Sequence, residues 1–135
     1  MIPQLINDDI SLDFEIVQHP TNTWRITFDG KPSAGMVTGL DAMVQTIHMI
    51  LTAERFKWST LSWNYGIELE RCFGIPDRML LQALLRQSIS EALLQDDRIT
   101  SVEDFEFEKN RTTVIVSFTA VTTVGTIDER MEVAI

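Results

Sequence analysis

The stretch from residue 76 to residue 122 limits the fold most strongly, because a long apolar helix pattern passes directly into two alternating strand patterns. Pro76 suits a first helical turn, and Asp77 suits the positive end of the helix dipole. Apolar residues then recur at helical spacing and predict a central core helix that ends near residue 94. This apolar stripe comprises Leu80, Leu81, Leu84, Leu85, Ile89, Ala92 and Leu93.

Two strands are predicted after this helix, at Ile99–Glu108 and Thr112–Thr122, because apolar and polar residues alternate there. The connection Lys109-Asn110 has the length of a hairpin turn, and asparagine tolerates the left-handed conformation that such turns require. A further C-terminal strand or tail is predicted at 126–135, after Gly125. Its alternating apolar positions are Ile127, Met131, Val133 and Ile135.

The N-terminal half predicts an extended arm at 1–20, a strand at Thr23–Phe28 and a helix at about 39–54. Residues 55–75 are irregular and rich in aromatic side chains. The helices are therefore grouped between strands, in the order ββ-α-α-βββ. This order predicts an α+β fold, with one domain at 21–125 that has two main helices and a mixed or antiparallel sheet.

The charge balance argues against nucleic acid as a partner. The 135-residue chain has a net charge of -9, and its residues 96–135 contain nine acids but only four bases. Phosphate backbones repel such a surface. No apolar run approaches the roughly 20 residues that span a membrane, so no membrane partner is expected. Cys72 is the only cysteine, which fits synthesis in a reducing, intracellular compartment.

The sequence shows no convincing catalytic, cofactor or metal site. His19 and His48 are far apart and Cys72 stands alone, so metal-ligand spacing is absent. Adjacent or alternate acids could form a catalytic carboxylate pair, but such pairs are expected by chance in so acidic a chain. They are Glu68 with Glu70, Asp96 with Asp97, and Glu103 with Asp104. Glu68 is the best single candidate for a general acid, because nearby aromatic residues could desolvate it. The aromatic cluster at 56–73, which includes Trp63 and Tyr65, is expected to form a small satellite core rather than a ligand platform.

The corner Asp96-Asp97-Arg98 lies between the central helix and the first long strand. It contains three charges in a tight turn, with no metal or nucleophile set nearby. It is therefore either a buried ionic joint between two elements or a surface that contacts another protein. Both interpretations favour assembly over catalysis.

Several segments occur in the order typical of a known family, and the similarity runs from about residue 1 to residue 125. The segments are Thr52-Ala53-Glu54-Arg55-Phe56, Ser62-Trp63-Asn64-Tyr65-Gly66, residues 91–99, Val102-Glu103-Asp104-Phe105 and Val116-Ser117-Phe118. Together they resemble the baseplate protein of PBSX-type prophages. That family belongs to the lysozyme-like baseplate wedge proteins of contractile tails, which have relatives in type VI secretion systems.

The resemblance implies a structural, non-enzymatic wedge subunit in the baseplate of a phage tail or tailocin-like particle, adjoining the first sheath ring. The wider group has a Glu-Pro-Arg motif for contacts within the wedge, and Asp96-Asp97-Arg98 keeps its acid and its arginine but lacks the proline. Expected partners are other wedge subunits, the sheath protein and tube-proximal hub proteins. The interaction residues expected are Asp96, Asp97, Arg98, Trp63, Tyr65 and Glu68 for the wedge, and Val133 and Ile135 for the sheath.

Two other functions stay open at this point. One is a peptidoglycan-cleaving, lysozyme-like enzyme with Glu68 as its general acid. The other is a regulatory adaptor that uses the same fold.

Overall fold

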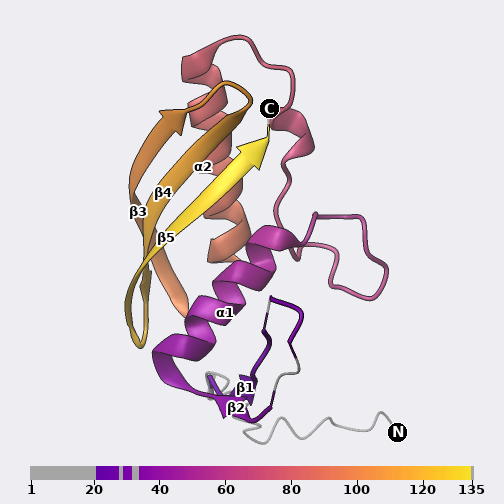
Figure 1. The fold of residues 1–135 in the computed structure, drawn as a ribbon, viewed down its shortest axis with the longest axis vertical. Helices are drawn as coiled ribbons and strands as arrows, with labels where there is room; N and C mark the ends of the chain where they lie inside the picture. The colour runs from indigo at the N-terminus through magenta and orange to yellow at the C-terminus, as the bar shows by residue number, and fades with distance from the viewer. Residues whose placement is uncertain (1–20, 28, 32–33, 135) are drawn as a thin grey trace, which may run out of the picture.

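The computed structural model describes residues 21–27, 29–31 and 34–134 (Figure 1). The predicted arm at 1–20 and the terminal Ile135 lie outside the described residues. Within them, two long helices and antiparallel β-structure form an α+β fold, as the sequence predicts. In the part of the chain that is described, no helix is long and apolar enough to cross a membrane.

The main sheet has three antiparallel strands, β3 (Ile99–Lys109), β4 (Thr113–Thr122) and β5 (Gly125–Ala134), in the order β3-β4-β5. Alternate residues of β4 are buried, which is the pattern of a strand with one face on the core. The predicted strands are therefore confirmed, with boundaries shifted by one residue. The buried β4 side chains are Val114, Val116, Phe118, Ala120 and Thr122.

Helix α2 (Arg78–Leu94) lies behind the sheet and packs against β3, while α1 (Gly39–Thr52) packs against α2 and β5 (Figure 1). The side chain of Asp77 accepts a hydrogen bond from the backbone N–H of Met79 at 3.0 Å, so Asp77 is the N-cap of α2. The apolar faces of both helices and the sheet form one core. Its fully buried members include Met43, Ile47, Leu85, Ile89, Leu93 and Val116.

A small ribbon of β1 (Thr23–Trp24) and β2 (Met36–Val37) lies beside the beginning of α1. The strand predicted at Thr23–Phe28 is thus shorter in the structure, and Phe28 lies outside the described residues. The reason is a side chain on α1: Gln45 accepts a hydrogen bond from the backbone of Ile26 at 2.9 Å and donates one to the carbonyl of Trp24 at 2.8 Å. Those backbone groups bond to the helix instead of to a strand.

The segment between the helices is closed at its base. The backbone N–H of Ile67 donates to the carbonyl of Ala53 at 2.9 Å, and that of Arg55 donates to the carbonyl of Ile67 at 3.0 Å. Gly66 has a φ of +99°, and a side-chain carbon at this position would collide with the Ala53 carbonyl oxygen. Residues 54–67, which we call the aromatic loop, therefore project from a fixed base, and the short helix η1 (Glu70–Cys72) follows them.

Candidate protein-interaction site

The tip of the aromatic loop exposes large apolar side chains. Trp63 is 71% exposed, Trp58 57% and Phe56 42%. The expected satellite core is therefore wrong for these residues, because their side chains lie at the surface instead of under the loop. The ring centroids of Phe56 and Trp63 are 4.7 Å apart, and the guanidinium of Arg55 lies 4.9 Å from the Phe56 centroid. Exposed apolar clusters of this kind mark sites of protein contact.

A polar network attaches the segment after this loop to helix α2. Arg71 donates two hydrogen bonds to the Ser88 hydroxyl, at 3.2 and 3.1 Å, and one to the Glu91 carboxylate at 3.2 Å. Arg55 adds an ion pair to the same carboxylate at 3.8 Å. Sequence reasoning missed this network, although Ser88 interrupts the apolar stripe of α2 and could have indicated it. The network orders the base of the loop before any partner binds.

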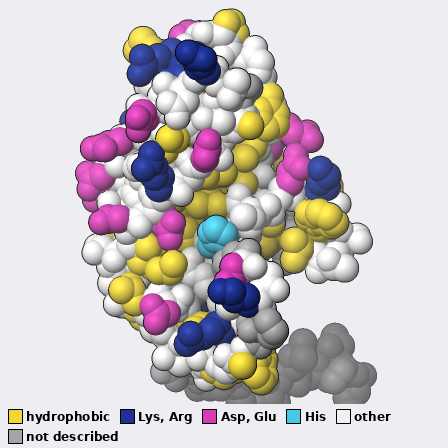
Figure 2. Space-filling model, in the orientation of Figure 1, with side chains coloured by type: hydrophobic (Ala, Val, Ile, Leu, Met, Phe, Trp, Pro, Cys, Tyr) yellow, Lys and Arg dark blue, Asp and Glu magenta, His cyan; other side chains and the backbone are white. Residues whose placement is uncertain are grey.

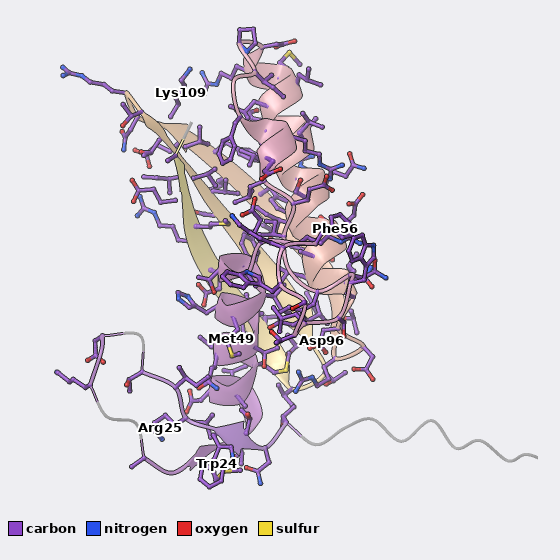
Figure 3. All side chains as sticks on the ribbon, turned by 90° about the vertical axis from the view of Figure 1, so that its right-hand side faces the viewer. Trp24, Arg25, Met49, Phe56, Asp96 and Lys109 are labelled. Carbon is purple, nitrogen blue, oxygen red and sulfur yellow. The ribbon has the colours of Figure 1, made fainter. Side chains whose placement is uncertain are left out.

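The structure brings the predicted loop residue Tyr65 close to the charged corner. Tyr65 is half-buried, and its pKa is raised first by burial and then by the negative charge of Asp96. Phe56 and Asp96 lie on the same side of the molecule, whereas Trp24 and Arg25 lie at its far end (Figure 3). The aromatic loop and the corner thus belong to one side of the protein.

At the corner, the side chains of Asp96 and Arg98 form an ion pair with each other. The guanidinium of Arg98 donates to both carboxylate oxygens of Asp96, at 2.9 and 2.7 Å, and the backbone N–H of Arg98 donates to Oδ1 at 3.0 Å. Their side chains are only 13% and 17% exposed. Burial would raise the pKa of Asp96, but the hydrogen bonds and charge of Arg98 outweigh it and lower that pKa. This geometry favours the internal joint, with Asp97 as the exposed acid of the corner.

The predicted sheath strand corresponds to β5. Its ten residues pair one-to-one with β4, from Gly125 opposite Thr122 to Ala134 opposite Thr113. Among the described residues β5 pairs on one side only, so it is an edge of the sheet. Val133 is 2% exposed and belongs to the core. The contact that β5 can offer is therefore made by its backbone and not by the side chain of Val133.

Glu68 lines a shallow pocket of about 250 Å³ together with Glu54, Lys57 and Glu70. Lys57 donates a hydrogen bond to Glu54 at 2.8 Å and lowers the pKa of that carboxyl. A general acid at neutral pH needs the opposite shift, so Glu54 is not suited to that role. Among the described residues, no group of three histidine, cysteine or acidic side chains could hold a metal ion.

Comparison with known proteins gives three results. A family model described as contractile injection system sheath initiator matches residues 17–125. The chain is 33% identical over 133 residues to the phage-like element PBSX protein XkdS of Bacillus subtilis strain 168, which covers 95% of this chain and 92% of that protein. The fold of this chain is similar to the crystal structure of a putative tail lysozyme from Geobacter sulfurreducens. The TM-score is 0.61, and the identity is 14% over 76% of this chain and 96% of that one.

Proposed function

The chain belongs to the contractile injection system sheath initiators, and we propose that it is a baseplate wedge subunit whose β5 edge pairs with the first ring of the sheath. The resemblance to PBSX-type prophage baseplate proteins is thereby confirmed, and the chain is a structural component of a contractile tail. It is made in the bacterial cytoplasm and joins a phage tail or a tailocin-like particle as that particle assembles.

One observation carries the sheath contact: β5 is a regular ten-residue edge with no irregularity in its pairing. An extended segment added to such an edge forms several backbone hydrogen bonds in register. Backbone pairing also needs no particular side chain from the incoming strand. This suits a contact that must transmit force from the sheath to the baseplate.

The contact with other wedge subunits uses the side of the molecule that carries the aromatic loop. Trp63, Trp58 and Phe56 supply apolar area, and the closed loop base keeps them in place before binding. The Asp96–Arg98 pair holds the corner beside them, from which Asp97 is accessible. Tyr65 lies near enough to this corner for the charge of Asp96 to act on it, and hub proteins near the tube are neighbours of the same wedge.

The wedge contact can be tested with two matched tryptophan variants. The full chain is co-expressed with the baseplate and sheath proteins encoded beside it, and complexes are isolated through a tag on a wedge subunit. We expect Trp63→Ala to lower, by at least tenfold, the amount of this chain that is recovered with the tagged wedge subunit. Trp24→Ala is the control, because Trp24 is 72% exposed but lies on the β1–β2 ribbon. Equal recovery of both variants would exclude the aromatic loop as the wedge contact.

If the chain is a structural wedge subunit, it should have no cell-wall hydrolase activity. Purified peptidoglycan is incubated with the wild-type chain and with Glu68→Gln, and its turbidity is followed. We expect negligible and equal clearing. Clearing by wild type that Glu68→Gln abolishes would instead establish the enzyme alternative.

A further inference from the structure

We infer that the β3 edge of the sheet is closed to strand addition, so that this chain extends its sheet through β5 alone. The inference rests on the proposed function, since it concerns the sheet to which a sheath strand would add. A three-stranded sheet has two edges, and strand addition at both would allow growth in two directions. The two edges of this sheet differ in three respects.

The first difference is a β-bulge in β3. Glu103 pairs with Thr119 and Glu106 with Ser117, so two residues of β3, Asp104 and Phe105, lie opposite the single residue Phe118. Asp104 has a φ of +53°, a left-handed conformation that glycine usually adopts at the first position of such a bulge. A bulge twists an edge and disrupts its row of hydrogen-bonding groups, which is a known protection against edge pairing. In contrast, β5 has ten consecutive pairs and no register shift.

The second difference is charge. Four of the six residues from Glu103 to Glu108 are acids, and all four are exposed, whereas the ten residues of β5 contain only three acids together with one arginine. Acidic side chains gather along the side of the sheet that β3 forms, as Figure 2 shows in magenta. An incoming strand would have to bring its backbone carbonyls close to these carboxylates. The acids therefore add electrostatic protection to the irregular backbone.

The third difference is a cation over the bulge. The guanidinium of Arg86 on α2 lies 5.4 Å from the ring centroid of Phe105 and 6.0 Å from that of Phe107. These distances fit cation–π contacts, which hold both rings against the core side of β3. The bulged strand is thereby attached to the helix behind it. It cannot straighten without giving up these contacts.

Hydrogen exchange with the full chain tests which edge is used. The amide exchange of the chain is measured alone and with the purified sheath protein of the same particle. Protection of amides in β5, with β3 unchanged, is the expected result. Protection that includes β3 would overturn the one-edge inference while leaving the sheath contact intact. Lack of any binding would instead refute the proposed function, and with it this inference.

A variant can also open the closed edge. Deleting Asp104 leaves Phe105 alone opposite Phe118, so that β3 regains regular pairing from Ser101 to Lys109, and Glu106→Thr with Glu108→Thr removes two of its charges. We expect this variant to self-associate at concentrations where wild type sediments as a monomer. Asp104→Gly keeps the bulge and relieves its conformation, so it should stay monomeric. Circular dichroism confirms folding, and a folded but monomeric deletion variant would show that the bulge does not close the edge.

Discussion

Replacing Gly66 by alanine should damage the base of the aromatic loop far more than replacing Gly74. Both glycines have positive φ, +99° and +74°, so an alanine is strained at either position. They differ in their surroundings. A side-chain carbon at Gly66 meets the Ala53 carbonyl group and the Arg55 backbone nitrogen, whereas one at Gly74 meets nothing within 4 Å. The comparison therefore separates backbone strain from steric collision.

The expected magnitudes follow from this difference. A left-handed conformation costs a residue with a side chain about 1–2 kcal/mol, which is the expected loss for Gly74→Ala. At Gly66 the neighbouring backbone must also move, and this breaks the two hydrogen bonds between Ala53, Arg55 and Ile67. Each such bond contributes about 0.5–1.5 kcal/mol, so Gly66→Ala should lose about 2–5 kcal/mol.

Urea denaturation of the two variants and wild type, followed by circular dichroism, measures these losses. The free energy of unfolding is extrapolated to water, and similar slopes are required for a valid comparison. If the aromatic loop makes the proposed wedge contact, Gly66→Ala should also fail to bind the wedge subunits, because the loop loses its fixed base. Equal destabilisation by the two substitutions would refute the steric argument. Full stability of Gly66→Ala would refute the closed loop itself.

Two further predictions concern titratable groups. Arg98 lowers the pKa of Asp96 in the folded state, so the stabilisation from this pair is complete above about pH 5 and is lost as the pH falls through the folded pKa. Unfolding curves should therefore show Asp96→Asn less stable than wild type by about 1–3 kcal/mol at pH 7, with a difference that shrinks below about pH 4; a pH-independent difference would contradict the ion pair. Cys72 is fully buried, and burial raises the pKa of its thiol. An aromatic disulfide reagent should therefore label Cys72 only as fast as the surrounding structure opens. Rapid labelling of the folded protein would contradict this burial.

The periodic elements could be predicted from the sequence because their side chains alternate between core and solvent. The apolar stripe of α2 and the alternation of β4 gave boundaries within two residues of the structure. The alternating pattern predicted too long a strand at β1, where one side chain from α1 binds the backbone. Gln45 on α1 takes the hydrogen bonds that a longer β1 would need, and a contact across 19 or more residues has no local signal.

The candidate site was only partly predictable. Sequence identified the aromatic residues but not their exposure, because a surface cluster and a small core have the same composition. The bulge in β3 did leave a signal. Apolar positions shift from the even number of Val102 to the odd numbers of Phe105 and Phe107, which requires an extra residue between them. The pairing of Asp96 with Arg98 could not be predicted, because the same three charges are equally compatible with a surface that binds another protein.

The joined ends of the aromatic loop make it an exchangeable module. Because Ala53 and Ile67 are already hydrogen-bonded, the residues between them can vary in length and composition while the ends keep the same anchor points. Doubling the length of such a loop costs only about 0.6 kcal/mol in closure entropy. Related particles could therefore acquire new binding partners by replacing this segment alone, and an engineer could graft a binding peptide there without redesigning the sheet.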